Sequence, residues 1–413
     1  MPFSDLPFTV NGRRYTPPAR PVAVVCLDGS ADEYLDTALA HGRMPHLQKM
    51  ALSGWRGMAR AAMPTFTNVN NSSIATGVPP AIHGIGGNFF FDTASGQEVM
   101  MNSASFLRVE TIFPSAQKAG RKVGVVTAKE KLRDIFASGL IPLGGIAFST
   151  EKARDARKET HGIGEVEMLA GPTPAIYSGE ASVYVLRAGV ALLASGLADF
   201  LYLSTTDFMQ HKFAPEAPEA LEFYAHIDEQ LGKLRALGAV VAVTADHGMN
   251  WKRKADGTPN VIYLESELTA QFGDGFRVIL PITDPYVVHH GALGSFAQVH
   301  LPSGVSVEEV RLWLLGRAGV TECHDRATAA RLMELPADRM GDLVVASGRE
   351  VVLGRTPDWH DLKAIESGLR SHGGRYEEMV PFVISEPLQG AAATMAGGDL
   401  RNFDIFALAC ATE

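Results

Sequence analysis

Short, almost wholly apolar runs recur along the chain, and each of them ends at polar or charged residues. The clearest run, 239–245, reads Ala-Val-Val-Ala-Val-Thr-Ala and leads directly into Asp246, His247 and a glycine. Runs of this kind predict strands that are buried on both faces, as in a parallel sheet covered by helices. Three more occur, at 22–27, 122–127 and 200–203. Because ligands bind at the carboxyl ends of such strands, the residues that follow each run are candidates for function.

Segments with helical spacing of apolar residues separate these runs. Helices are predicted at 32–53, 106–119, 181–195 and 218–237, and from about residue 402 onward. The polar segment 63–77 is typical of a loop that feeds a helix beginning near Asn70, and 150–175 of an excursion at the surface. This alternation predicts an α/β core with a mostly parallel sheet between helices.

The alternation stops after Met249. Between 252 and 365 the chain carries short strand-like pieces and one predicted helix, 307–318. The strand-like pieces are 261–264, 278–280, 297–301, 343–346 and 350–353. This pattern predicts a smaller α+β cap domain inserted into a discontinuous core made of 1–251 and 366–413, with a last core strand at 380–384. In the cap, the residues considered as candidates to face a cavity are Tyr286, His289 and His290.

Composition narrows the range of functions. The chain has 413 residues, of which 46% are hydrophobic and 20% charged, and this is ordinary for a globular protein. A net charge of −9 argues against general nucleic-acid binding, and three widely spaced cysteines predict neither a disulfide framework nor a cysteine-type zinc site. With no signal-like N-terminus and no membrane-spanning run, we expect a cytoplasmic protein that acts on a small molecule, not on nucleic acid or membrane. A homodimer is left open.

Ligand-type side chains follow three of the predicted strands. Asp28 follows the first strand, Asp207 and His211 follow another one helical turn apart, and Asp246 and His247 end the run at 239–245. Each residue alone has an ordinary explanation as a helix cap or a turn residue. Together they would crowd three carboxylates at one sheet edge, where the charges repel each other unless cations are bound. Two divalent ions about 4 Å apart would remove that cost and would suit an in-line displacement at phosphorus.

The loop at 63–77 is a candidate source of a nucleophile. Its hydroxyl residues are Thr65, Thr67, Ser72, Ser73 and Thr76. A helix N-terminus there would present N–H groups and positive dipole to an anion, and a metal-bound hydroxyl would be ready to attack. On composition alone, the loop is better explained as a capping segment. His372, in a glycine-rich loop before the last strand, is a candidate for a sixth ligand.

Taken in order, these motifs resemble the alkaline phosphatase superfamily of two-metal hydrolases, most closely its nucleotide pyrophosphatase/phosphodiesterase branch. The resemblance covers about 20–250 and 366–410, and it rests on Asp28, 64–68, 73–77, Asp207-x-x-x-His211, 246–249 and 372–373. It implies that Thr67 is the nucleophile. It further implies two zinc ions, one held by Asp28, Asp246 and His247 with Thr67, the other by Asp207, His211 and His372. Manganese, iron or cobalt would also suit aspartate and histidine ligands.

Within that branch, the chain resembles the phosphonoacetate hydrolases. Residues 127–131, Thr-Ala-Lys-Glu-Lys, place Lys129 and Lys131 just beyond a predicted strand, where they would neutralise a substrate carboxylate. The resemblance implies that Asn88 donates a hydrogen bond to the phosphoryl oxygens, with Asn68 as a second candidate. It implies zinc-dependent hydrolysis of the C–P bond of phosphonoacetate to acetate and phosphate. Thr67 would attack phosphorus, and the lysines and zinc would stabilise a carbanion or enediolate leaving group. Without the resemblance, both lysines are better explained as a solvated loop end.

Other functions stay open at this point. A nucleotide or alkyl phosphodiesterase or phosphomonoesterase of the same superfamily would keep the ligands and Thr67, but would need an aromatic or apolar pocket instead of the lysines. A cofactor-independent phosphoglycerate-mutase-like isomerase shares the metal pattern, but such an enzyme would have a serine nucleophile and an inserted domain at a different place in the chain. A sulfatase would need cysteine or serine in a Cys/Ser-x-Pro-x-Arg context. A non-catalytic metal-binding relative is disfavoured because six ligand candidates and a nucleophile are all present.

Overall fold

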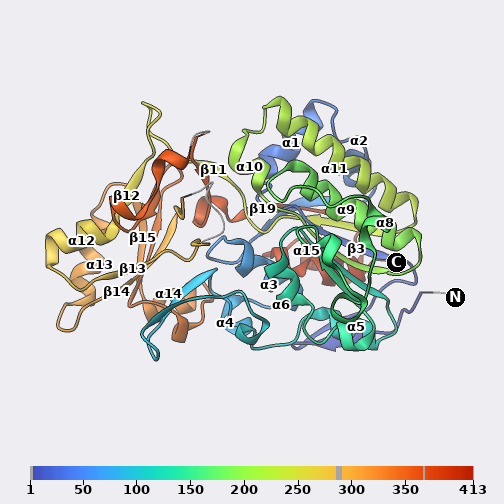
Figure 1. The fold of residues 1–413 in the computed structure, drawn as a ribbon, viewed down its shortest axis with the longest axis horizontal. Coiled ribbons are helices and arrows are strands. Elements are labelled where there is room, and N and C mark those ends of the chain that lie inside the picture. The colour runs from blue at the N-terminus through green and yellow to red at the C-terminus, as the bar shows by residue number, and fades with distance from the viewer. Residues whose placement is uncertain (1–2, 285–290, 366–367, 413) are drawn as a thin grey trace.

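The computed structural model describes residues 3–284, 291–365 and 368–412. The chain forms two lobes of unequal size (Figure 1): the larger contains both termini and the long helices, and the smaller contains mainly short strands. The cavity candidates Tyr286, His289 and His290 lie outside the described residues. The domain bounds predicted at 251/252 and 365/366 stay a proposal.

A seven-stranded sheet runs through the larger lobe in the order β4-β19-β10-β3-β9-β7-β8. Its five parallel strands are β10 (Val240–Thr244), β3 (Val22–Cys26), β9 (Phe200–Ser204), β7 (Val123–Thr127) and β8 (Ile146–Ser149). Strand β19 (Met379–Ile384) runs antiparallel to both of its neighbours, β10 and β4 (Trp55–Arg60). Every residue of the five parallel strands is buried, which explains their continuous apolar sequences. The predicted α/β fold is confirmed.

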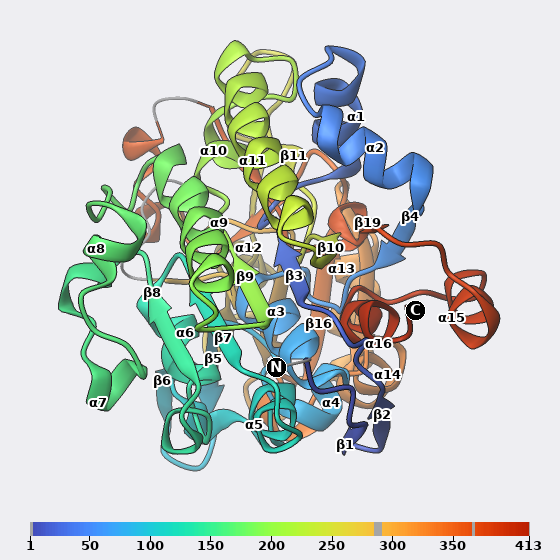
Figure 2. The ribbon, with the colours of Figure 1, turned by 90° about the vertical axis from the view of Figure 1, so that its right-hand side faces the viewer.

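Helices cover both faces of this sheet (Figure 2). One face packs against α1 (Asp32–Ala40), α2 (Pro45–Ser53), α9 (Gly179–Ala194) and α11 (Pro218–Ala236). The other face packs against α3 (Thr67–Thr76), α5 (Ile112–Lys118), α6 (Glu130–Phe136) and α16 (Ile405–Cys410). Side chains of each strand alternate between the two faces, so that each layer of helices has its own apolar core.

Several predicted boundaries were wrong. The helix at 32–53 is two helices, because Gly42 takes a positive φ of 67° and Pro45 starts the second one. The helix at 106–119 begins only at Ile112, and α3 begins three residues before Asn70. The surface excursion contains the short helices α7 (Lys158–His161) and α8 (Val166–Ala170). Strands β4 and β8 were missed, since β4 mixes apolar residues with two arginines and a glycine and is half-exposed, and β8 is only four residues long.

The smaller lobe is built on a four-stranded antiparallel sheet in the order β13-β14-β16-β15. These strands are β13 (Arg277–Ile279), β14 (Phe296–His300), β16 (Leu343–Ser347) and β15 (Val320–Asp325). The prediction of one helix was wrong: the described part of 252–365 contains α12 (Leu264–Phe272), α13 (Val307–Leu315) and α14 (Arg326–Leu332). Its apolar cluster also takes in Met63, Phe66 and Val69, so the two lobes share a core where α3 begins.

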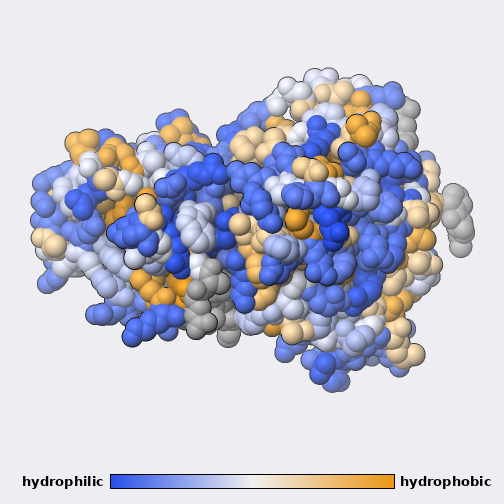
Figure 3. Space-filling view, turned by 90° about the horizontal axis from the view of Figure 1, so that it is seen from above, coloured by the Kyte–Doolittle hydropathy of each residue, from blue (hydrophilic) through white to orange (hydrophobic). Residues whose placement is uncertain are grey.

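Smaller elements complete the described chain. They are β1 (Phe8–Val10), β2 (Arg13–Tyr15), α4 (Pro80–His83), β5 (Phe89–Asp92), β6 (Gln97–Met100), α10 (Phe208–Lys212), β11 (Asn250–Trp251), β12 (Val261–Tyr263), β17 (Val352–Gly354), β18 (Arg370–Ser371) and α15 (Gly390–Ala396). Strands β11 and β18 pair where the chain leaves and re-enters the larger lobe. In the face seen in Figure 3, hydrophilic residues predominate and apolar residues form small, scattered patches. Among the helices of the described segments, none has the length and apolar character needed to cross a bilayer.

Candidate active site

Strand order explains why the candidate ligands meet. Strands β10, β3 and β9 are adjacent and parallel, so their carboxyl ends lie side by side at one edge of the sheet. Asp28 follows β3, Asp207 follows β9 and Asp246 follows β10, and all three carboxylates are buried. The order of the strands therefore brings together at one sheet edge the three carboxylates that follow separate apolar runs in the sequence.

The first group of potential ligands consists of Asp28, Asp246 and His247, whose ligand atoms lie within 4.8 Å of one another. Nε2 of His247 is 3.2 Å from Oδ1 of Asp28 and 3.8 Å from Oδ2 of Asp246. Oδ1 of Asp246 accepts hydrogen bonds from the backbone N–H groups of Gly29 (3.1 Å) and His247 (3.0 Å). These bonds fix the carboxylate while leaving the group compact enough to hold one metal ion.

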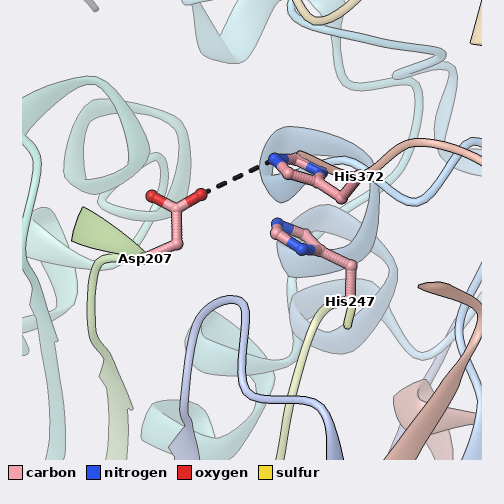
Figure 4. A group of neighbouring side chains, drawn as sticks. All are labelled: Asp207, His247 and His372. Carbon is pink, nitrogen blue, oxygen red and sulfur yellow. Dashed lines mark ion pairs between the residues drawn. The ribbon is translucent and has the colours of Figure 1, made fainter. Parts of the chain in front are cut away.

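The second group consists of Asp207, His247 and His372 (Figure 4), again within 4.8 Å. Oδ2 of Asp207 lies 3.6 Å from Nε2 of His372 and 2.9 Å from Nε2 of His211. The rings of His247 and His372 stack with centroids 3.6 Å apart and planes 7° from parallel. His247 thus borders both groups, and His211 joins the second one through Asp207.

Three histidines share one arrangement of their ring nitrogens. Nδ1 lies 2.9 Å from the carbonyl oxygen of Gly248 in His247, 2.7 Å from that of Thr65 in His372, and 2.7 Å from that of Arg370 in His211. A carbonyl oxygen only accepts, so Nδ1 carries a proton in each ring and Nε2 is the nitrogen that can bind a metal ion. In all three, Nε2 faces a carboxylate. Metal-binding histidines are held in this way, and the donor set therefore fits two divalent ions.

The charges of the cluster point to the same conclusion. Burial raises the pKa of Asp28 to about 7, and the charges of Asp207 and Asp246 add to the rise. Although burial opposes it, the charges of Asp246 and Asp28 raise the pKa of His247 to about 10. Burial and the neighbouring His247 lower the pKa of His372 to about 4. Without a cation the cluster can hold its carboxylates ionised only by protonating a ligand histidine, a conflict that bound metal removes.

Thr67 is the first residue of α3. Its Oγ1 lies 3.4 Å from Nε2 of His247. The other loop hydroxyls with described hydrogen bonds point elsewhere: Thr65 and Thr76 bond backbone groups, and Ser73 bonds His83. Of the five candidate hydroxyls, Thr67 is the one that contacts a potential ligand, and its place at a helix N-terminus favours an anion there.

Lys129 and Lys131 line a cavity of about 250 Å³. Lys129 precedes the first turn of α6 and Lys131 lies within it. Burial opposes protonation of Lys129, but the charges of Asp207 and Asp28 raise its pKa, which places its ammonium within electrostatic reach of both ligand groups. Lys131 forms an ion pair with Asp284 of the smaller lobe, which also lines the cavity.

Comparison with known proteins assigns the site to a family. The model of the type I phosphodiesterase/nucleotide pyrophosphatase family matches residues 22–154 and 198–373. The chain belongs to this family. Crystal structures of phosphonoacetate hydrolase from Sinorhizobium meliloti 1021, in complex with phosphonoformate and with phosphonoacetate, are similar over 99% of this chain and 100% of that one, with 47% identity and TM-scores of 0.94 and 0.93. Murine ectonucleotide pyrophosphatase/phosphodiesterase 5, 16% identical over 95% and 94% of the two chains with a TM-score of 0.63, shares the fold. The protein is a hydrolase.

Two asparagines of this hydrolase are candidates for binding the phosphoryl group. Nδ2 of Asn88 donates to the carbonyl of Ile282 (3.2 Å), and Nδ2 of Asn68 donates to the carbonyl of Met101 (3.1 Å). Both Oδ1 atoms are buried and accept no hydrogen bond from the described residues. The structure keeps both as candidates, since each amide retains a second N–H for a phosphoryl oxygen.

Sequence reasoning missed two residues of this phosphodiesterase-family site. Asp284 pairs with Lys131 across the two lobes, and no local pattern around Asp284 indicates it. Asn71 bonds directly to a potential ligand, Asp246, from the start of the helix that the sequence predicted near Asn70. Its helical spacing from Thr67, four residues, was the available signal, because residues at that spacing share one helix face.

Proposed function

We propose that this hydrolase cleaves the C–P bond of phosphonoacetate to give acetate and phosphate. The observation that supports the proposal is a partly buried lysine, Lys129, whose pKa is raised, although burial opposes it, by the charges of the candidate ligands Asp207 and Asp28, in a chain 47% identical to a phosphonoacetate hydrolase over almost its full length. The carboxylate of such a phosphonate, one carbon from phosphorus, would be an anionic partner for Lys129 and Lys131.

Asp28, Asp246 and His247, with Thr67, would hold one divalent ion, and Asp207, His211 and His372 the other; we propose zinc. Bound metal would supply charge neutralisation at the phosphonyl oxygens and would lower the pKa of hydroxyl groups beside it. The hydrogen bonds from Nδ1 of the three histidines orient these ligands before substrate arrives.

Thr67 would form the first covalent bond. Its Oγ1 attacks phosphorus in line, the C–P bond breaks, and the electron pair stays on the departing carbon. The proton that the Thr67 hydroxyl gives up to solvent balances the one that the carbon takes from water to give acetate. A water molecule then hydrolyses the phospho-threonine to release phosphate and restore Thr67. Asn88 or Asn68 would donate to the phosphoryl oxygens during both steps.

The lysines would answer the main difficulty of this reaction, which is that a carbanion is a poor leaving group. Delocalisation moves its charge onto the carboxylate as an enediolate, and Lys129 and Lys131 line the cavity in which that group would lie. A phosphodiester has no charge at this position. The lysines therefore separate the proposed substrate from the nucleotide or alkyl esters of other phosphodiesterases.

The test compares two substrates in zinc-loaded protein. We expect phosphate release from phosphonoacetate to fall about 100- to 1,000-fold in Lys129→Ala/Lys131→Ala, while cleavage of a nitrophenyl phosphodiester falls much less. Lys122→Ala is the matched control, because Lys122 is exposed just before the opposite end of the same strand. Brisk diester cleavage with inert phosphonoacetate would identify a phosphodiesterase instead. We also propose a cytoplasmic location and a homodimer, the latter testable by sedimentation.

A further inference from the structure

Asn71 lies at the point where three parts of the site meet. It is on α3, one turn beyond Thr67, and it is fully buried. Its Nδ2 donates to Oδ2 of Asp246 at 3.0 Å and to the carbonyl of Thr67 at 3.1 Å. Its Oδ1 accepts from the hydroxyls of Tyr202 at 2.7 Å and Ser204 at 2.6 Å, both on β9. One amide thus touches the nucleophile's helix, one candidate ligand and the strand that leads to Asp207.

The neighbours of Asn71 allow one orientation of its amide. An ionised carboxylate and a backbone carbonyl only accept hydrogen bonds, so the side facing Asp246 and Thr67 must be the NH₂ group. The opposite side is then Oδ1, which needs donors. Burial raises the pKa of Tyr202 well above its usual value, so its hydroxyl keeps the proton that it donates. All four contacts are satisfied together, and a reversed amide would break each of the bonds on the carboxylate side.

The Asn71 amide holds one of the two carboxylate oxygens of Asp246. Its Oδ1 is held by two backbone N–H groups, those of Gly29 and His247. The hydrogen bond that the structure describes on Oδ2 comes from Asn71. A carboxylate that binds metal must keep its rotation fixed, and groups that hold ligands in this way contribute strongly to metal affinity.

We propose that Asn71 is a positioning residue that fixes Asp246 for metal binding and ties it to the backbone of Thr67 and to β9. The inference rests on the proposed two-metal centre. On this proposal α3 has two roles: it carries Thr67, and through Asn71 it orients the candidate ligand Asp246. Tyr202 and Ser204 act behind Asn71 by holding its Oδ1.

The neighbouring Asn70 offers a matched control. It has the same side chain on the same helix and is equally buried. Its amide, however, bonds the backbone N–H of Ala62 (2.7 Å), the carbonyl of Ala62 (2.9 Å) and Nδ2 of Asn402 (3.0 Å), away from the ligands. Replacing either asparagine by aspartate preserves shape and the acceptor Oδ1 but removes the NH₂ donor. Both variants bury a new carboxylate, but the one at position 71 also faces Asp246. Tyr202→Phe adds no charge and therefore separates the loss of positioning from that repulsion.

The experiment measures zinc binding by competition with a chromophoric chelator in wild type, Asn71→Asp, Asn70→Asp and Tyr202→Phe. We expect Asn71→Asp to weaken one of two sites about 10- to 100-fold, Tyr202→Phe to weaken the same site less, and Asn70→Asp to keep both affinities. The zinc-induced rise in melting temperature should shrink only in Asn71→Asp and Tyr202→Phe. Two unchanged sites in Asn71→Asp, or equal losses in Asn70→Asp, would overturn the inference. Fewer than two sites in wild type would instead overturn the proposed metal centre.

Discussion

The buried ion pair between Lys252 and Glu377 should couple stability to metal binding. Both side chains are completely buried, and Nζ of Lys252 lies 2.9 Å from Oε1 of Glu377. Nζ also donates to Oγ of Ser295 and to the carbonyl of Arg349, each at 2.7 Å. The other carboxylate oxygen of Glu377 accepts the backbone N–H of Gly374 at 3.0 Å, two residues beyond His372. The pair therefore supports the loop that carries this candidate ligand.

The size of the effect follows from burial. Removing one partner leaves the other charge uncompensated, which costs about 3–5 kcal/mol, whereas replacing both charges is far less costly. We expect Lys252→Met and Glu377→Gln each to lose about 3–5 kcal/mol of unfolding free energy. The double variant should lose less than either single variant, so the two losses should be far from additive. Because Glu377→Gln weakens the acceptor for Gly374, zinc affinity should fall as well.

The assay combines urea unfolding of the metal-free proteins, followed by fluorescence and circular dichroism, with zinc titration. Arg121→Met is the matched control, because Arg121 and Asp199 form another buried pair, 2.7 Å apart, at the opposite end of the sheet. That variant should lose stability while it keeps its zinc affinity. Additive losses in the double variant, or an equal fall in zinc affinity in the control, would refute the coupling of this pair to the His372 loop.

Four further outcomes follow from the structure. Thr67→Ser should keep much of the activity while Thr67→Ala loses about 1,000-fold or more, and dialysis against a chelator should lower both activity and melting temperature until zinc is returned. Burial lowers the pKa of His83 to about 3, so between pH 7 and 4.5 the unfolded chain binds a proton at this histidine and the folded chain does not. The free energy of unfolding should therefore fall by about 3 kcal/mol as the pH drops from 7 to 4.5. His83→Gln should make this pH dependence of stability less steep in acid unfolding. At Gly77, where φ is +70°, an alanine Cβ would lie 2.2 Å from the Tyr15 hydroxyl, so Gly77→Ala should destabilise by about 1–3 kcal/mol more than Gly238→Ala, which has φ +85° but open space around it; equal melting temperatures would contradict this.

The sequence predicted the buried strands well because their chemistry is uniform. Each parallel strand that it found, such as β3 and β10, is buried on both faces and therefore reads as a continuous apolar run. Strand β4 alternates weakly and is partly exposed, so its sequence lacks that signal. The start of α3 was misplaced because Thr67, Asn68 and the residues after them are polar yet fully packed, which is the opposite of an amphipathic surface helix.

The ligand candidates could be inferred because they follow strands, whereas their partners could not. Asp28, Asp207 and Asp246 carry a local signal, a polar residue at the end of an apolar run. The contacts of Lys131 with Asp284 and of Asn71 with Asp246 join residues that are 153 and 175 positions apart. Such contacts depend on how the lobes and helices are packed; the spacing of Asn71 from Thr67 indicates a shared helix face but not the partner on the other element.

The smaller lobe belongs to the foundation of the site. Phe66, the residue before Thr67, packs edge-on against Phe296 of the smaller lobe and against His372, with centroids 6.2 and 5.7 Å apart. Backbone N–H of Ser295 donates to the carbonyl of His372 at 2.9 Å. The smaller lobe therefore contacts both the start of the Thr67 helix and the loop of the candidate ligand His372, and through Asp284 it also contacts Lys131. If the packing of this lobe changed, the positions of Thr67, His372 and Lys131 would change with it. We therefore expect substitutions in the lobe near these contacts to be tolerated as poorly as substitutions in the core.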